Sequence, residues 1–438
     1  MKKLYQFLLI GGVITLSSCD KFLDIEPKGM VVPSTTEDFR QLLNSGYNIF
    51  PKYKSNVAFR SDELTANTND DNFPVFQNIY IWEDVITTTQ TLQYPYEDFY
   101  KSIFYANETI NSGQSRMPDS PEKNQLIAEA YALRAYNYFS LISMYARSYN
   151  KLTAATDSGV PINLIVDLEQ DFPKASVQAT YDQILSDIQK AESLMQQNTW
   201  EVGLNYRFAR ANLYALAARV YLHMGEYTSS VSYANKALSI NNSLVDLNNS
   251  QTQPSAYNSV ESLLALENTF TLQLQKASFV SDELIAMYDT TNDLRFATYM
   301  TSDSGKYKVS KAGNDSFKCS FRTAELYLNK AESEARLGNE SSAKNTLLIL
   351  LKNRYSTTHY ATIEQHINTL SGNDLINEIL NERMRELAFE GHRWFDLRRT
   401  NQKQINHTLN GQTHTLQAND PRYTIPFPKE AIQNNKNL

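Results

Sequence analysis

The sequence has 438 residues, with 41 basic and 48 acidic side chains and a formal net charge of −7. This acidic balance, without any basic patch along the chain, argues against nucleic-acid binding. The chain has two cysteines, Cys19 and Cys319, and they form no disulfide framework if the first carries lipid, so the fold must rest on its hydrophobic core.

Residues 1–18 are predicted to be a signal peptide, because Lys2 and Lys3 precede an apolar stretch over residues 4–16. That stretch is shorter than the ~20 apolar residues that span a bilayer. The sequence LSSC, ending at Cys19, resembles the lipobox of bacterial lipoproteins, in which the cysteine is acylated. We therefore predict that Cys19 carries the lipid and that residues 19–35 form a tether. The alternative is an ordinary signal peptide followed by an incidental cysteine.

Four segments of the N-terminal half have the spacing of apolar residues that is typical of amphipathic helices. They span residues 37–50, 94–112, 125–150 and 178–197. Ser34-Thr35-Thr36 supplies a capped start for the first segment, and Gly159-Val160-Pro161 predicts a turn into an extended segment. Residues 61–96 lack helical periodicity and carry the polar sequence SDELTANTNDDNFP, so we expect a long loop region with short strands there.

A helix pair of the tetratricopeptide type is predicted over residues 214–242, followed by a weaker copy over residues 325–351. In such a pair, small residues let two antiparallel helices approach, aromatic residues fill the groove between them, and a glycine permits the tight turn. The positions that fit are Tyr214, Ala217, Ala218, Tyr221, Gly225, Tyr227, Ala234 and Ala237, with Gly338 at the second turn. The two glycines are far more than one repeat of about 34 residues apart, so long insertions separate the pairs.

Those insertions, around residues 241–319, are polar and include a predicted strand in the sequence SLLALE. With residues 61–96 they are the expected ligand-side loops, since long loops on a rigid scaffold often carry binding residues. Residues 67–72, NTNDDN, offer oxygen atoms to a structural calcium ion, although a solvated loop is the commoner interpretation of such a sequence. No other cofactor is expected.

Aromatic residues in or beside these loops are the candidate ligand contacts, because flat rings pack against the C–H surfaces of sugars. The candidates are Trp82, Tyr80, Tyr94, Tyr96, Tyr257, Phe296 and Tyr299. The competing interpretation is that such rings pack between helices.

The stretch ELAFEGHRWFDLRR, residues 386–399, concentrates charged and aromatic side chains after a predicted helix over residues 374–390. In a functional interpretation, Glu386, Glu390 or Asp396 would form an acid/base pair, or His392 and Asp396 would bind a metal ion.

In a structural interpretation, Gly391 ends the helix, RWFDLRR begins a second one, and the charges satisfy one another at the corner. We favour the structural interpretation because it needs nothing beyond a helix corner. In addition, the sequence contains no motif of a known catalytic class. The sequence therefore predicts no catalytic residue and no metal-binding residue.

Six motifs occur in the same order as in one known family. They are AEAYALRAYNYFSLISMY, Gly159-Val160-Pro161, LIAMYDTTNDLR, RTAELYLNKAESEARLG, FEGHRWFDLRR and RYTIPFPKEAIQNNKNL. Through these motifs nearly the whole mature chain resembles the SusD/RagB family of Bacteroidetes outer-membrane lipoproteins.

The resemblance implies a mostly α fold in which tetratricopeptide-like helix pairs form a superhelical scaffold, with long irregular insertions and short β-hairpins, as a single domain over residues 36–438. It also implies a non-catalytic lipoprotein, anchored and exposed at the outer membrane, that captures a glycan and delivers it to a SusC-like TonB-dependent transporter for nutrient uptake. Alternatives are a peptide-binding member of the family, a lipid-anchored tetratricopeptide adaptor that binds only protein, and a surface glycosidase.

Overall fold

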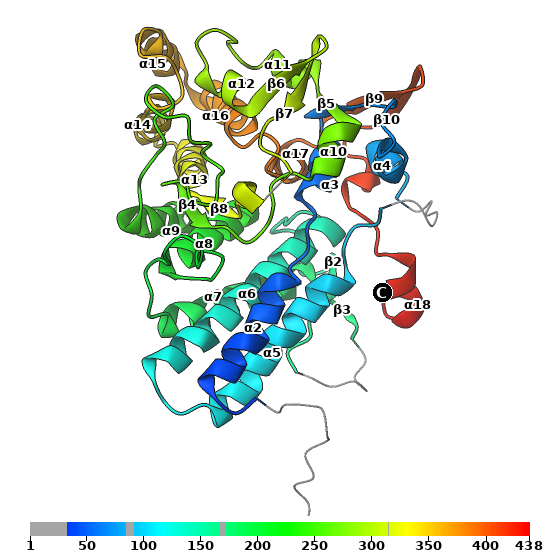
Figure 1. Cartoon of the computed structure of the whole chain (residues 1–438), viewed down its shortest axis with the longest axis vertical. Coiled ribbons are helices and arrows are strands. Elements are labelled where there is room, and N and C mark those ends of the chain that lie inside the picture. The colour runs from blue at the N-terminus through cyan, green and yellow to red at the C-terminus, as the bar shows by residue number, and fades with distance from the viewer. Residues whose placement is uncertain (1–32, 85–91, 166–171, 314) are drawn as a thin grey trace, which may run out of the picture.

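The computed structural model describes residues 33–84, 92–165, 172–313 and 315–438. Cys19 and the predicted tether up to residue 32 lie outside the described residues. Long helices fill one end and one side of the molecule, and short helices and strand pairs gather at the other end (Figure 1). The scaffold helices are α2 (Thr36–Asn48), α5 (Glu97–Arg116), α6 (Pro121–Tyr145), α7 (Val177–Leu194), α8 (Arg210–Met224), α9 (Tyr227–Ile240), α13 (Thr323–Arg336), α14 (Glu340–Leu351) and α16 (Gly372–Glu386).

The four predicted N-terminal helices are present as α2, α5, α6 and α7. The cap of α2 is the one that the sequence predicts. The Thr35 hydroxyl accepts a hydrogen bond from the Asp38 backbone N–H at 3.1 Å, and the Asp38 carboxylate accepts one from the Thr35 N–H at 2.9 Å. Two backbone donors that would otherwise lack partners are thus satisfied at the helix start.

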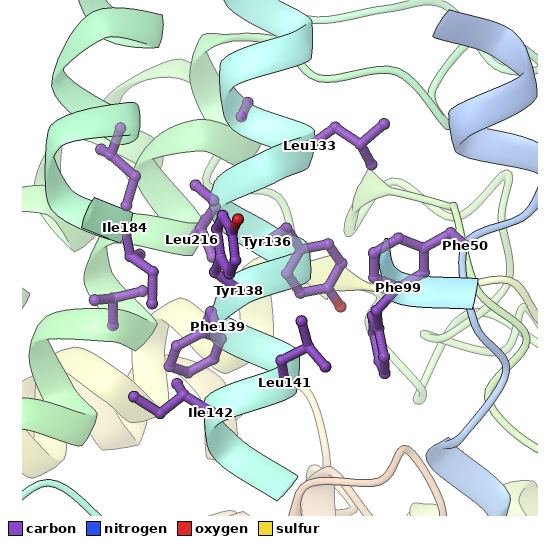
Figure 2. Close-up of a cluster of buried hydrophobic side chains, with 14 of the residues drawn as sticks. Phe50, Phe99, Leu133, Tyr136, Tyr138, Phe139, Leu141, Ile142, Ile184 and Leu216 are labelled. Carbon is purple, nitrogen blue, oxygen red and sulfur yellow. The ribbon is translucent and has the colours of Figure 1, made fainter. Parts of the chain in front are cut away.

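Helix α6 is the centre of the larger hydrophobic core, because nearly all of its residues are buried. A helix that is apolar around most of its circumference must be covered on several sides. Figure 2 shows how Phe50 and Phe99 pack on one side of α6 and Ile184 and Leu216 on another. The ring of Tyr136 stacks on Phe50 with centroids 4.9 Å apart.

The two tetratricopeptide-like pairs are α8 with α9 and α13 with α14, and α13 also packs against α9. Both predicted turn glycines have left-handed backbone conformations, with φ of 75° at Gly225 and 79° at Gly338. The close approach rests on Ala217, Ala218 and Ala234, each fully buried. The predicted fold class, tetratricopeptide-like helix pairs with insertions, is confirmed.

Short elements make up the rest of the described chain. The helices are α3 (Lys54–Phe59), α4 (Phe73–Tyr80), α10 (Leu272–Ala277), α11 (Asp282–Ile285), α12 (Leu294–Tyr299), α15 (Tyr360–Thr369), α17 (Arg393–Thr400) and α18 (Lys429–Asn434), with 3-10 turns at Asp315–Phe317 and Pro421–Tyr423.

The strands form antiparallel pairs. They are β1 (Leu64–Ala66) with β5 (Ser278–Val280), β2 (Ser158–Pro161) with β3 (Lys174–Ser176), β4 (Ser262–Leu264) with β8 (Phe321–Arg322), β6 (Met300–Asp303) with β7 (Lys306–Val309), and β9 (Ile405–Leu409) with β10 (Gln412–Leu416).

The expectation of a loop with short strands over residues 61–96 is partly wrong, because α4 occupies residues 73–80. Pro74 lies in its first turn, where proline leaves no hydrogen bond unmade. Phe73, Phe76 and Tyr80 follow helical spacing and enter a second core cluster. The segment is too short to give a clear periodicity, so tertiary packing decides its conformation.

Among the described residues, no helix combines the length and the apolar character needed to cross a membrane.

Candidate functional site

The stretch 386–399 forms a helix corner whose charged groups bind one another. Glu386, at the end of α16, accepts hydrogen bonds from Arg322 at 2.6 Å, from Arg354 at 2.8 Å and from Arg295 at 3.0 Å. Burial alone would raise the pKa of Glu386, but the three guanidinium groups hold it well below its usual range. A carboxylate stabilised in this way stays charged and does not serve as a proton donor.

Asp396 is also paired with cationic side chains, whereas the buried Arg398 has no carboxylate partner among the described residues and donates to the Ala146 carbonyl. Burial opposes ionisation of Asp396, but Arg383 and Arg399, at 2.9 and 2.8 Å, hold its pKa far below its usual range. Burial, reinforced by nearby cationic side chains, lowers the pKa of His392 well below its usual range, so its ring is neutral. The described chain contains no group of three histidine, cysteine, aspartate or glutamate side chains arranged to hold a metal ion. This geometry matches the structural interpretation of the stretch.

Trp82 and Tyr80, two of the predicted ligand contacts, belong to the core. The ring of His407 lies between them, with centroid distances of 4.1 Å to Tyr80 and 4.4 Å to Trp82. The Trp82 indole N–H donates to the Arg60 carbonyl at 3.0 Å. Because Trp82 is 2% exposed and Tyr80 is 1% exposed, neither offers an open ring face to a ligand.

Phe296 and Tyr299 are also core residues, and the ammonium group of Lys311 lies 3.7 Å from the centroid of the Tyr299 ring. Tyr257 is half-buried, and its backbone N–H donates to the Ser316 carbonyl at 2.9 Å. The insertion around residues 241–319 is therefore tied down by its own contacts. None of these three rings lines the cavity that holds Tyr94 and Tyr96.

Tyr94 and Tyr96, the remaining candidates, line a cavity of about 840 Å³. This volume lies within the range of ~300 to 1,000 Å³ that is typical of small-molecule sites. The wall combines aromatic rings with neutral amides. The rings are Phe50, Tyr94, Tyr96, Tyr100 and Phe172, and the amides are Asn48, Asn56, Gln93, Asn163, Asn434 and Asn435.

Hydrogen bonds from tyrosines fix the aromatic side of this cavity. The Tyr145 hydroxyl, on α6, donates to the Pro95 carbonyl at 2.9 Å and thereby holds the loop that carries Tyr96. The Tyr100 hydroxyl, in α5, donates to the Pro161 carbonyl at 2.9 Å. Tyr96 packs edge-on against Tyr145, and burial raises its pKa to about 12, so the phenol is neutral at physiological pH.

Sequence reasoning missed Tyr100, Phe172 and Asn434 as lining residues. Tyr100 belongs to a helix and follows its packing pattern, so nothing in the sequence distinguishes it from a core tyrosine. Asn434 comes from the far C-terminal region, and only tertiary structure brings it opposite α5. The proline pair in the motif RYTIPFPKEAIQNNKNL could have indicated that the segment with Asn434 leaves the helical scaffold.

The predicted calcium segment, residues 67–72, is a turn whose only described carboxylate contacts are internal. The Asp70 carboxylate accepts hydrogen bonds from the Asn72 backbone at 2.9 Å and from its side chain at 2.7 Å. These contacts are those of an aspartate turn, and calcium binding here stays a prediction.

Comparison with known proteins links both halves of the chain to one family. Residues 21–222 match a SusD-like family model described as "Starch-binding associating with outer membrane", and residues 234–438 match the model of the SusD family. The chain is 24% identical to SusD-like protein P38 of Formosa agariphila, an alignment that covers 93% of each chain.

Solved structures share the fold. A SusD superfamily protein from Bacteroides fragilis superposes with a TM-score of 0.77 at 21% identity, over 93% of this chain and 100% of that one. A structure described as a laminarin-binding SusD-like protein superposes with a TM-score of 0.62 at 20% identity, over 83% of this chain and 91% of that one.

Proposed function

The chain belongs to the SusD/RagB family, and we propose that it is a non-catalytic surface lipoprotein that captures a glycan and delivers it to a TonB-dependent transporter for nutrient uptake. The observation that carries this proposal is the cavity of about 840 Å³ between α5 and α18. Its aromatic rings suit the C–H faces of sugars and its amides suit their hydroxyl groups.

The absence of catalysis in this proposal rests on the charged groups at the helix corner. Glu386, Glu390 and Asp396 each contact two or more cationic side chains, so they are committed to the fold. The carboxyl groups near the cavity, such as Glu97 and Glu430, stand on exposed side chains. A glycosidase instead needs two carboxyl groups held at a defined separation across the scissile bond.

Attachment to the outer membrane is assigned to Cys19 in this proposal, on the strength of its lipobox-like sequence. The lipid would anchor the chain at a single point, and the helix pairs would face the transporter. Repeat-like scaffolds use such curved, rigid surfaces to bind proteins.

The test of capture is calorimetric titration of the purified protein with soluble oligosaccharides, alongside Tyr96→Ala and the exposed Phe104→Ala as a matched control. We expect one class of oligosaccharide to bind, with Tyr96→Ala weakening it at least about tenfold, since a stacked ring contributes on the order of 1 to 2 kcal/mol. Release of reducing sugar from the bound oligosaccharide would instead support the glycosidase alternative.

The test of delivery is affinity capture from detergent-solubilised outer membranes of the native host. We expect the protein to recover a TonB-dependent barrel, and Tyr96→Ala to recover it equally well. If only soluble periplasmic or cytoplasmic proteins are recovered, the transporter assignment is wrong.

A further inference from the structure

Helix α18 (Lys429–Asn434) and the residues that follow it separate two cavities. Glu430, Ala431 and Asn434 of α18, with Asn435 and Leu438 after it, line the cavity of about 840 Å³. Lys429, Ile432 and Gln433, on another face, line a neighbouring apolar cavity of about 380 Å³. The larger cavity therefore lies between the start of α5, with Tyr96 and Tyr100, and α18, with Asn434.

Asn434 at the end of α18 and Asn435 directly after it have different roles. The Asn435 side chain donates to the Phe172 carbonyl at 2.8 Å, and its oxygen accepts from the Asn437 backbone N–H at 3.0 Å, so it holds the segment in place. The Asn434 side chain is exposed to the cavity and has no hydrogen-bond partner among the described residues. It is available to donate to, and accept from, a ligand hydroxyl.

Charged groups around the larger cavity disfavour an anion. Among the described residues that line it, Lys52 is the only cation, whereas Glu97, Asp98 and Glu430 are carboxylates. The Lys101 ammonium nitrogen lies 2.7 Å from a Glu97 carboxylate oxygen and 3.9 Å from one of Asp98, so Lys101 is already paired. A ligand carboxylate or sulfate would find no arginine fork here, and arginine is the usual partner of such groups.

Besides Lys52, the N-terminus of α5 is a feature of the cavity that could attract an anion. Tyr96 at its N-cap makes no side-chain capping hydrogen bond. Glu97 and Asp98 occupy the first turn, however, and their charges already complement the helix dipole. A bound anion would therefore be repelled by these two carboxylates, whereas a neutral hydroxyl group would not.

We propose that this cavity selects an uncharged, hydroxyl-rich glycan and discriminates against uronic-acid and sulfated glycans, with Asn434 of α18 as a ligand contact opposite Tyr96 and Tyr100. The inference rests on the proposed function, because it concerns the class of glycan that the same cavity takes.

The test measures affinity for matched hexasaccharides by calorimetry in low-salt buffer. The neutral probes are β-1,3-glucan, α-1,4-glucan and β-1,4-mannan oligosaccharides, and the anionic probes are oligoalginate and oligogalacturonate. We expect at least one neutral probe to bind at least about tenfold more tightly than either uronate. Equal or tighter binding of a uronate would overturn the inference and leave glycan capture intact, whereas no binding of any probe would count against both.

Three variants test which residues of α18 contact the glycan and which disfavour a uronate. Asn434→Ala should weaken the affinity for the neutral glycan about three- to tenfold, which is the loss expected for one hydrogen bond. Gln433→Ala, on the face that lines the other cavity, should change it less than twofold. Glu430→Lys should strengthen uronate binding several-fold at low salt, and added salt should remove that gain.

All three side chains are exposed, so the variants are expected to keep the melting temperature of the parent protein. If Asn434→Ala and Gln433→Ala weaken binding equally, or if Glu430→Lys leaves uronate affinity unchanged, the placement of the ligand against α18 is wrong.

Discussion

At the scale of single residues, the buried charges of this protein are structural. Arg322 contacts Glu261, Glu386 and Glu390 in a region where all of these side chains are at most 1% exposed. Removing one partner from such a cluster leaves an uncompensated buried charge, which costs ~3 to 5 kcal/mol. Mutual satisfaction of charges therefore explains Glu386, Glu390 and Asp396 in the C-terminal motif, whereas Arg398 there donates to the Ala146 carbonyl instead.

The indole of Trp394 should be a major determinant of stability. It is fully buried, stacks on Tyr423 with centroids 4.9 Å apart and lies 4.8 Å from the guanidinium of Arg60. We expect Trp394→Ala to lower the free energy of unfolding by ~3 to 5 kcal/mol, measured by denaturant titration. Phe104→Ala, at a ring that is 43% exposed, is the control and should change it by less than about 1 kcal/mol.

The same motif also allows a test of the functional interpretation. His392→Ala and Asp396→Asn should leave oligosaccharide affinity within about twofold of that of the parent protein. The comparison is made on the folded fraction of each variant. A variant at either position that melts normally but no longer binds would revive an active role for the corner.

Glu63 should make stability depend on pH. Burial, reinforced by the charge of Asp62, raises its pKa from 4.5 to about 7, although the Phe389 N–H donates to it at 2.8 Å. The native state therefore binds this proton more tightly than the unfolded chain, and the contribution of Glu63 to stability falls as pH rises from about 4.5 to about 7.

We expect Glu63→Gln, which is neutral at every pH, to match the parent near pH 4 and to exceed its free energy of unfolding by about 2 to 3 kcal/mol at pH 8. Denaturant titrations at both pH values measure this difference. Glu364→Gln, at an exposed position, is the control and should show no such divergence. An equal effect of Glu63→Gln on the free energy of unfolding at pH 4 and pH 8 would contradict the raised pKa of Glu63.

At the scale of elements, the helix pairs depend on small residues and on left-handed turns. The Ser230 hydroxyl on α9 donates to the Ala218 carbonyl on α8 at 3.0 Å, which requires the two helices to lie close together. Alanine at their contact positions allows this approach, and Gly225 reverses the chain at a φ of 75° that L-residues with a Cβ rarely adopt.

Gly225→Ala should lower the free energy of unfolding by ~1 to 2 kcal/mol, the usual cost of a left-handed conformation for an L-residue. Steric overlap does not explain the expected loss, because the added Cβ would meet no atom closer than 3.8 Å. Gly225→Asn is the matched comparison and should lose less, since asparagine tolerates this conformation better. Equal losses in both variants would point to a cause other than backbone strain.

At the scale of the whole molecule, the scaffold and the ligand side are built from different parts of the chain. Helix α6 joins α5, α7 and α2 into one packed unit. The cavity opens beside that unit, between the start of α5 and α18, and Figure 1 shows α18 standing at the edge of the molecule. The rigid scaffold thus supports a cavity whose second wall is a short, exposed helix.

Membrane attachment is predicted to depend on Cys19, because the sequence LSSC that ends there resembles a lipobox. We expect Cys19→Ala to leave the protein soluble or unprocessed, as judged by fractionation in a strain that lacks the transporter. Ser18→Ala, beside the modified position, is the control and should remain in the outer membrane. Continued membrane fractionation of Cys19→Ala would show that another anchor exists.

The sequence by itself determined the long helices, the capped start at Thr35, the turns at Gly225 and Gly338 and the family, because local periodicity and motif order carry that information. It also favoured a structural corner at residues 386–399, since paired charges at a helix junction need no further partner. It did not predict α4 or the β9–β10 hairpin, which are short and are stabilised by packing.

Only the tertiary structure decided which aromatic rings face a cavity. Trp82 and Tyr96 have the same kind of loop environment in sequence, yet Trp82 stacks on His407 from a distant hairpin, whereas Tyr96 lines the cavity. The opposite wall, at Asn434, is hundreds of residues away along the chain. Exposure of a side chain depends on such long-range contacts, which cannot be predicted from the local pattern of a single sequence.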